Sequence, residues 1–216
     1  MTVGHLPDQF FLRLFAVVLL ATAAVALSTC RNPAGSASPR TKVIVYVTNE
    51  NDDSVTVIDG NDEVVLGTIG VGNAPRGIAT NPTTRKSYVA NYGAGTVTVF
   101  DGMTNLVLKT ITLAGTNPQM VGINPSTNKV YVAYEYYGDY VEIIDGGSDT
   151  VSTTYSTSGN YPVGIGPNPA SGKIYVVLWG DSSVDIIDAA SDLNAGNITP
   201  ITSDYDGGIA VRGVST

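Results

Sequence analysis

The chain is dominated by short segments in which hydrophobic and polar residues alternate, and these segments recur about every 43 residues. Alternation of this kind is typical of half-buried β-strands, because successive side chains of a strand point to opposite faces. One strand of each unit carries a tyrosine, with spacings of 42, 43 and 44 residues between Tyr46, Tyr88, Tyr131 and Tyr175. The pattern therefore predicts four copies of one β-unit.

Each unit contains the same succession of strands and turns. The tyrosine strand is followed by a strand that ends in aspartate, and three of these four aspartates precede a glycine, which permits a tight turn. A third strand, as at 64–71 and 107–113, ends in a proline corner, and a glycine-rich strand and an Asn-Pro turn complete the unit. Four strands in about 43 residues predict a β-propeller blade, with the glycine-rich strand innermost, where blades crowd the axis.

The signature Tyr46-Val47-Thr48-Asn49 resembles the repeat for which the YVTN β-propeller family is named. Residues 88–91, Tyr-Val-Ala-Asn, form a near copy, and the other two units keep only the first half of the signature. The resemblance covers residues 43–214. It implies a relative of surface-layer proteins, periplasmic proteins and exported lipoproteins, which are usually seven-bladed rings.

The predicted fold is all-β, with four four-stranded antiparallel blades in residues 42–216. The chain begins on the second strand of a blade and ends on an innermost strand at 208–211, which could complete the first blade of a closed four-bladed ring. The Asn-Pro turn expected after that strand is missing. We therefore favour an open arc of a truncated seven-bladed propeller. An open arc exposes strand edges and predicts self-association.

Residues 1–29 are predicted to be a signal peptide. Their apolar run, 14–27, is too short for a comfortable membrane span and fits the central region of a secretory signal. The single cysteine, Cys30, follows directly in a sequence that resembles a bacterial lipobox. We expect lipidation at Cys30, a flexible tether over 30–41, and a membrane-anchored lipoprotein of the periplasm or cell surface. An ordinary signal peptide and a secreted protein are the alternative.

The composition narrows the possible chemistry. The only histidine, His5, lies in the predicted signal peptide, so the mature chain lacks the Ser-His-Asp and Cys-His pairs and the His-ligated zinc and haem sites. No cofactor is expected. The net charge of −8 disfavours nucleic acid as a partner, because phosphate backbones are anionic.

Several aromatic and charged residues are predicted on the face that carries the loops between the second and third strands of each blade. The segment 134–140 offers flat amphipathic contact area for a protein or carbohydrate through Tyr134, Glu135, Tyr136, Tyr137, Asp139 and Tyr140. Alternatively, some of these rings pack between blades. Trp179 occupies the equivalent loop and extends the patch. Arg76, beside an innermost strand, either meets an anionic ligand or donates a structural hydrogen bond to a carbonyl.

The remaining acidic candidates are Glu50, Asp52 and Asp53, whose oxygens are of the type that Ca²⁺ prefers. No EF-hand pattern accompanies them, and a solvated acidic turn is the favoured interpretation.

The leading functional hypothesis is a non-enzymatic extracytoplasmic binding or scaffold module of the cell envelope. One alternative is a lactonase- or lyase-like propeller enzyme that uses acidic residues and a divalent metal on the central face. The innermost strands carry mainly Gly, Ile, Ala, Asn and Pro, however, and show no convergence of carboxylates. A second alternative, implied by the family resemblance, is a periplasmic DNA-binding propeller, which the acidic charge opposes.

Overall fold

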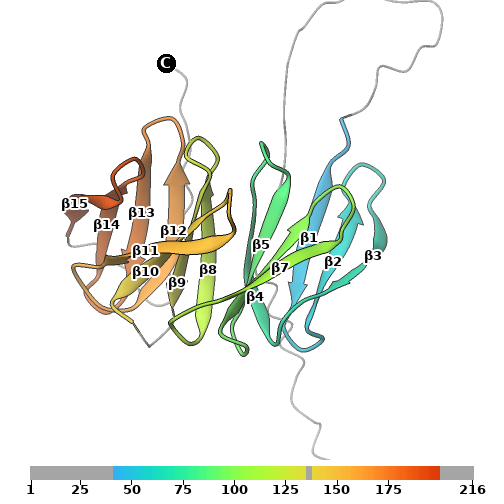
Figure 1. Ribbon diagram of the computed structural model, residues 1–216, viewed down its shortest axis with the longest axis horizontal. Helices are drawn as coiled ribbons and strands as arrows, with labels where there is room; N and C mark the ends of the chain where they lie inside the picture. Colours follow the sequence, from blue (N-terminus) through green and yellow to red (C-terminus); the bar gives the residue numbers. More distant parts are fainter. Residues whose placement is uncertain (1–40, 135–137, 200–216) are drawn as a thin grey trace, which may run out of the picture.

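The computed structural model describes residues 41–134 and 138–199, and within them it contains strands and turns but no helix. The strands form four antiparallel sheets that follow one another along the chain (Figure 1). The sheets consist of β1 (Ile44–Asn49), β2 (Ser54–Asp59) and β3 (Val64–Gly70); β4 (Pro75–Thr80), β5 (Lys86–Asn91), β6 (Thr96–Asp101) and β7 (Val107–Thr112); β8 (Pro118–Asn124), β9 (Lys129–Tyr134), β10 (Tyr140–Asp145) and β11 (Thr150–Ser156); and β12 (Pro162–Asn168), β13 (Lys173–Leu178), β14 (Ser183–Asp188) and β15 (Leu193–Ile198).

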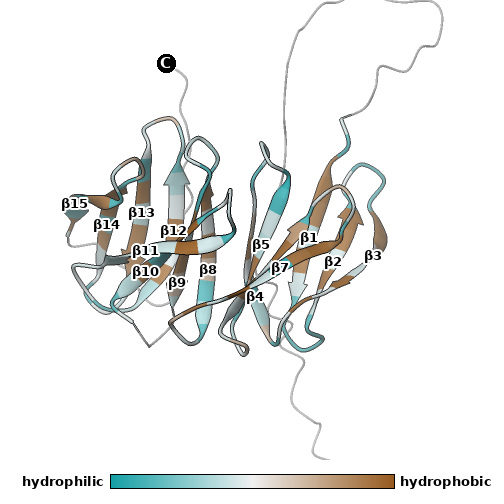
Figure 2. Ribbon diagram, in the orientation of Figure 1, coloured by the Kyte–Doolittle hydropathy of each residue, from teal (hydrophilic) through white to brown (hydrophobic). Residues whose placement is uncertain are grey.

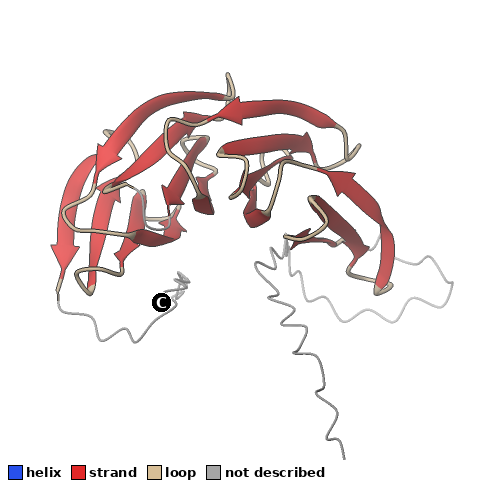
Figure 3. Cartoon of the chain, turned by 90° about the horizontal axis from the view of Figure 1, so that it is seen from below, coloured by secondary structure: helices blue, strands red, loops and turns tan. Residues whose placement is uncertain are grey.

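The sheets form an open arc (Figure 3). The strands β4, β8 and β12 lie side by side in succession, and β1 lies beside β4. Within the described residues the first sheet has three strands, and the strand predicted at 208–211 falls outside them. The predicted all-β propeller blades are therefore confirmed, and the described blades follow the arc that we favoured over the closed ring.

The turns repeat as the sequence predicts. Between β6 and β7, the Asp101 carboxylate accepts hydrogen bonds from the backbone N–H groups of Met103 and Thr104, at 2.9 and 2.8 Å. The aspartates that end β2, β10 and β14 close their turns in the same way. An acceptor two residues before the donor holds such a turn without help from the rest of the fold.

Glycine in the innermost strands is explained by close packing of neighbouring blades. A Cβ atom at Gly77 in β4 would lie 2.7 Å from the backbone oxygen of Gln119 in β8. A Cβ atom at Gly122 in β8 would lie 2.4 Å from the Ile165 side chain in β12. The predicted crowding at the axis is therefore confirmed at both positions.

The hydrophobic core is divided among three junctions, each between two neighbouring sheets. Apolar residues run along the strands, and polar residues gather toward the strand ends and turns (Figure 2). In the first junction, for example, Tyr46 packs edge-on against Phe100 with 5.1 Å between ring centroids. Each sheet therefore derives its packing from its neighbours alone, as in other repeat folds.

The predicted signal peptide, Cys30 and all but the last residue of the tether lie outside the described residues. Within the described part of the chain, no helix is long and apolar enough to span a membrane.

Candidate functional site

Arg76, at the start of β4, joins three sheets on the predicted loop face. Its Nε and Nη2 atoms each lie 3.1 Å from Glu50 Oε1 in the first sheet, and Nη1 lies 2.6 Å from Gln119 Oε1 in the third. Its guanidinium also lies 3.4 Å from the ring centroid of Tyr92. Within the described residues, these partners are a carboxylate, an amide oxygen and an aromatic ring, and the predicted hydrogen bond to a carbonyl stays a prediction. An anionic ligand at this position would have to compete with Glu50.

The tyrosine-rich loop supplies core packing as well as surface. Tyr134 is fully buried, and its hydroxyl donates to Glu142 Oε1 at 2.6 Å. Burial and the adjacent Glu142 carboxylate raise the pKa of Tyr134. The ring of Tyr140 lies 5.3 Å from that of Tyr134. The prediction of Tyr134 as a ligand contact is therefore corrected, because this ring packs between blades.

Of the other residues predicted in the 134–140 segment, three lie outside the described residues and Asp139 is exposed. Glu135, Tyr136 and Tyr137 lie outside the described residues. The exposed Asp139 accepts a hydrogen bond from Thr157 N through its backbone oxygen at 2.8 Å.

Trp179 is half-buried, and its ring lies 5.8 Å from that of Tyr161, which is 37% exposed. The backbone reinforces this pairing, since Trp179 N donates to Tyr161 O at 3.0 Å. Sequence reasoning missed Tyr161 as the partner of Trp179, because the two rings come from different turns of the fourth blade.

The acidic turn after β1 contributes to the first junction. The Asp53 carboxylate accepts from Ala74 N at 2.8 Å and from Asn73 Nδ2 at 3.1 Å, across to the segment that leads into β4. Glu50 pairs with Arg76, and Asp52 is exposed. Within residues 41–134 and 138–199, no group of three or more His, Cys, Asp or Glu side chains is arranged to hold a metal ion.

Every junction contains a buried side-chain acceptor that binds the backbone N–H groups between two blades. Glu142 Oε1 accepts from Ala114 N and Gly115 N at 2.9 and 3.0 Å in the second junction. Asn91 Oδ1 binds Gly72 N in the first junction, and Asp185 Oδ2 binds Ser158 N in the third. We call this contact the junction clasp. Sequence analysis overlooked it, although a carboxylate within an apolar strand was a visible signal, since buried charges need polar partners.

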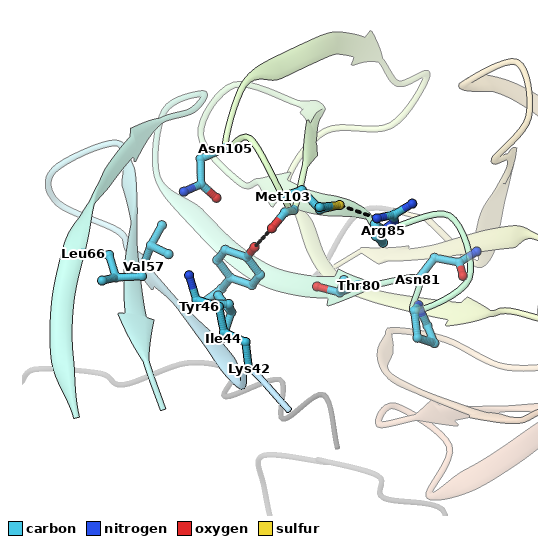
Figure 4. A pocket seen from close by; sticks show the side chains of 12 residues that line it. Lys42, Ile44, Tyr46, Val57, Leu66, Thr80, Asn81, Arg85, Met103 and Asn105 are labelled. Atoms are coloured by element: carbon cyan, nitrogen blue, oxygen red, sulfur yellow. Dashed lines mark hydrogen bonds between the residues drawn. The ribbon is translucent and has the colours of Figure 1, made fainter. Parts of the chain in front are cut away.

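A pocket of about 420 Å³ lies between the first and second sheets, near the turns at the opposite ends of the strands from Arg76 (Figure 4). The first sheet contributes Lys42, Ile44, Tyr46, Val57 and Leu66 to its walls, and the second contributes Thr80, Asn81, Pro82, Arg85, Gly102, Met103 and Asn105. No residue of this pocket was predicted as a site residue; Tyr46, the Asn81-Pro82 turn and Gly102 attracted attention only as parts of the repeat.

The pocket lies where the first junction lacks a lysine that the other two contain. In the second junction, Lys86 Nζ lies 3.0 Å from Gly146 O and 2.6 Å from Asp149 Oδ2. Lys129 makes the same contacts with Ala189 O and Asp192 in the third, at 3.1 and 2.6 Å. These two ion pairs, together with their carbonyl contacts, are called here the lysine bridges.

In the first junction, the residues equivalent to Lys86 and Asp149 are Ile44 and Asn105. Ile44 is paired with the turn aspartate of its sheet, as Lys86 is with Asp101. Asn105 is the fourth residue after its turn aspartate and has φ 59°, close to the 54° of Asp149. The strand registers are therefore retained while the bridging side chains are lost.

Polar groups remain inside this pocket. The Tyr46 hydroxyl donates to Gly102 O at 3.0 Å, and burial raises the pKa of Tyr46, with a smaller contribution from Asp101. The Asn105 Oδ1 atom is buried and has no hydrogen-bond partner within the described chain. Lys42 and Arg85 are the only charged residues among those that line the pocket.

Comparisons with known proteins support the fold. No family model and no curated protein matches the chain. Among solved structures, 1246 chains match, so the architecture is widely shared. One is the hydrazine synthase of Kuenenia stuttgartiensis, a β-propeller protein with 27% sequence identity and a TM-score of 0.66. The match covers 71% of this chain and 45% of that chain, so this chain matches less than half of the hydrazine synthase chain.

Proposed function

We propose that this protein is an exported, non-enzymatic binding or scaffold module of the cell envelope, built from YVTN-family blades. The proposal rests mainly on one observation: charged side chains on the loop face form contacts between neighbouring sheets. Arg76, Glu50 and Asp53 join the first two sheets, and Arg76 also reaches the third. Their contacts stabilise an extended surface, which suits a module whose work is to present that surface to a partner.

The proposed YVTN-family membership, which comes from the sequence signature, is supported by a structural role of the asparagine that ends it. Asn49 Nδ2 donates to Ser54 Oγ and Thr56 Oγ1, at 3.0 and 2.8 Å. Asn91 repeats the pattern with Thr96 and Thr98, both at 2.9 Å. The asparagine thus joins its strand to hydroxyls of the next strand, which gives a physical reason for its place in the repeat.

The proposed partner is a protein or a carbohydrate of the cell surface, and the Tyr161–Trp179 ring pair is its proposed contact. Aromatic rings provide large contact areas at a low cost in conformational entropy, and they stack well on sugar rings or apolar side chains. Asp139 and Asp181 belong to neighbouring loops of the same face and supply hydrogen-bond acceptors.

Localisation is tested with the full-length chain and its Cys30→Ala variant, expressed in a bacterium and fractionated. We expect the wild type in the membrane fraction, with an intact mass that fits residues 30–216 plus a diacylglyceryl and an acyl group. The variant should leave the membrane fraction. An unlipidated wild type that fractionates like the variant would rule out the anchor.

Binding is tested by incubating the mature chain with envelope fractions that have been treated with protease or with periodate. Loss of binding after one treatment identifies the partner as protein or carbohydrate. The Trp179→Ala variant should weaken binding about tenfold or more, because a central aromatic contact is worth a few kcal/mol. Retention of full affinity by this variant would exclude the ring pair. A rise in melting temperature with Ca²⁺ would instead favour the metal-dependent enzyme, and a salt-sensitive DNA gel shift would favour the DNA-binding alternative.

A further inference from the structure

We infer that the pocket between the first two sheets binds a small organic anion with an alkyl body and a hydrogen-bond donor. The inference goes beyond the proposed function, because the pocket lies near the turns at the opposite ends of the strands from Arg76 and shares no residue with the Tyr161–Trp179 pair.

The size and walls of the pocket fit an alkyl group. A volume of about 420 Å³ falls in the range of ordinary small-molecule sites. The side chains of Ile44, Val57 and Leu66 line it from the first sheet; in Figure 4 Val57 and Leu66 lie together, and Ile44 lies beside Tyr46. In the next junction the equivalent space holds the four-carbon stem of Lys86. A flexible alkyl chain is therefore the shape for which the repeat provides room.

The end of the pocket at Asn105 calls for a hydrogen-bond donor. The buried Asn105 Oδ1 has no partner within the described chain, whereas its equivalents Asp149 and Asp192 each accept from a lysine. Buried polar atoms are almost always hydrogen-bonded in folded proteins. A hydroxyl or amide N–H of a ligand would satisfy this atom.

The charged residues that line the pocket favour an anionic ligand over a cationic one. Lys42 approaches from the first sheet and Arg85 from the second, and the lining residues include no carboxylate (Figure 4). The Arg85 guanidinium also contacts Met103 Sδ, which places it beside the pocket. Both cations are exposed at the rim, and the Asp101 carboxylate, whose pKa is lowered by the hydrogen bonds of its turn and to a smaller extent by nearby Arg85, does not line the pocket. The lining itself is therefore locally positive in a chain with net charge −8, which favours a carboxylate. Arginine is well suited to a carboxylate because its planar fork can donate two parallel hydrogen bonds.

The experiment uses 8-hydroxyoctanoate as the probe and the mature chain with ¹³C-methyl methionine. Met103 lines the pocket, so its methyl resonance reports ligand binding. Met120 packs in the third junction, so its methyl resonance serves as an internal control. We expect 8-hydroxyoctanoate to shift the Met103 resonance in a saturable manner and to leave Met120 unchanged. Octanoate, which lacks the donor, should bind about three- to tenfold more weakly, and the cation 8-amino-1-octanol should not bind.

Two variants make the test decisive. Ile44→Lys combined with Asn105→Asp rebuilds the lysine bridge in the first junction, so it should abolish binding while the protein remains folded. Arg85→Ala should weaken 8-hydroxyoctanoate at least fivefold, and the exposed Asp52→Ala should have no effect. The inference is overturned if no probe shifts Met103 at millimolar concentration, if Met103 and Met120 shift together, or if the rebuilt bridge leaves affinity unchanged.

Discussion

The first and second junctions use the same strand registers but differ in what occupies the space beside their turns. In the second junction Lys86, Tyr88 and Asp149 form a connected polar group, with Tyr88 Oη 2.7 Å from Asp149 Oδ1. In the first, Tyr46 turns to Gly102 O, and a pocket lies where the lysine would be. The comparison shows that a repeat fold can have a cavity in one junction and an ion pair in the next, with the strand pairing retained and with similar φ angles at Asn105 and Asp149.

The largest expected effect comes from breaking the lysine bridge of the second junction. Asp149→Ala leaves the Lys86 ammonium and the Tyr88 hydroxyl without their partner in a site where the Lys86 and Asp149 side chains are only 21% and 11% exposed. We expect a loss of about 3 kcal/mol in the free energy of unfolding, measured in urea. The matched variant Asn105→Ala in the first junction should cost about 1 kcal/mol, mainly because alanine is less suited than asparagine to φ 59°, a cost that Asp149→Ala shares at φ 54°. The difference between the two variants reports the bridge, because Asn105 Oδ1 has no partner within the described residues. Equal losses in the two variants would contradict the comparison.

The second effect is on alkaline stability. Burial and then the hydrogen bond to Asp149 raise the pKa of Tyr88, whereas burial with a smaller contribution from Asp101 raises that of Tyr46. A tyrosine with a raised folded-state pKa contributes stability that is fully present below about pH 10, its unfolded pKa, and is lost as the pH rises through the folded value. Stability should therefore fall above about pH 10.

The junctions are distinguished in this pH range by two phenylalanine variants. Tyr88→Phe should reduce the slope of unfolding free energy against pH by up to about 1.4 kcal/mol per pH unit, the linkage limit for one group. Tyr46→Phe should reduce it no more than Tyr88→Phe does, since Asn105 carries no charge. The measurement is the urea midpoint between about pH 9 and 11.5, and a larger effect from Tyr46→Phe would refute the assignment.

The third prediction concerns a double variant that gives the first junction the lysine bridge of the second. The double variant Ile44→Lys, Asn105→Asp should raise the free energy of unfolding by about 1 kcal/mol, since it adds a partly buried ion pair and fills a cavity. Differential scanning calorimetry measures the change. The single variant Ile44→Lys is the control and should destabilise the protein, because its ammonium would face a neutral amide. Destabilisation by the double variant as large as that by the single one would show that the two sites are not equivalent.

The smallest effect is expected at Lys109, which reaches across the second junction to Ser148 O at 3.2 Å from an exposed position. Its equivalent in the first sheet is Gly67, as the pairing opposite Val99 and Val57 shows. Lys109→Ala should cost less than about 0.5 kcal/mol, because an exposed contact competes with water. A loss above 1 kcal/mol in thermal unfolding would mean that this lysine, as well as Lys86, separates the two junctions.

Much of the fold was predictable because the same local sequence features recur in successive units. The turn aspartates, the proline corners and the crowded glycines each follow from short-range chemistry that one unit already displays. Within the described residues, the first sheet starts with the tyrosine strand β1, which pairs with β2 as the tyrosine strands of the other sheets pair with theirs.

The site was less predictable, because its contacts cross from one unit to the next. Lys86 meets Asp149 at a separation of 63 residues, more than one repeat, so neither residue draws attention alone. Alignment of the units does place Ile44 against Lys86, Lys129 and Lys173, and this exception was the available signal for the pocket. The prediction for Tyr134 was wrong for a related reason. The sequence shows a cluster of rings, but not that Tyr134 packs in the core of the second junction, with its hydroxyl on Glu142 in the following strand.

The contiguity of each sheet sets the order in which the protein can assemble during synthesis. The strands β4 to β7 occupy one uninterrupted segment, so this sheet can pair its strands as soon as that segment has emerged. Its lysine bridge, however, must wait for residue 149 in the blade that follows. Each newly made blade therefore fixes the one before it, and the growing chain always carries one blade whose lateral contacts are incomplete. The first junction has no lysine bridge to complete, but its ring pair between Tyr46 and Phe100 also waits for the second blade.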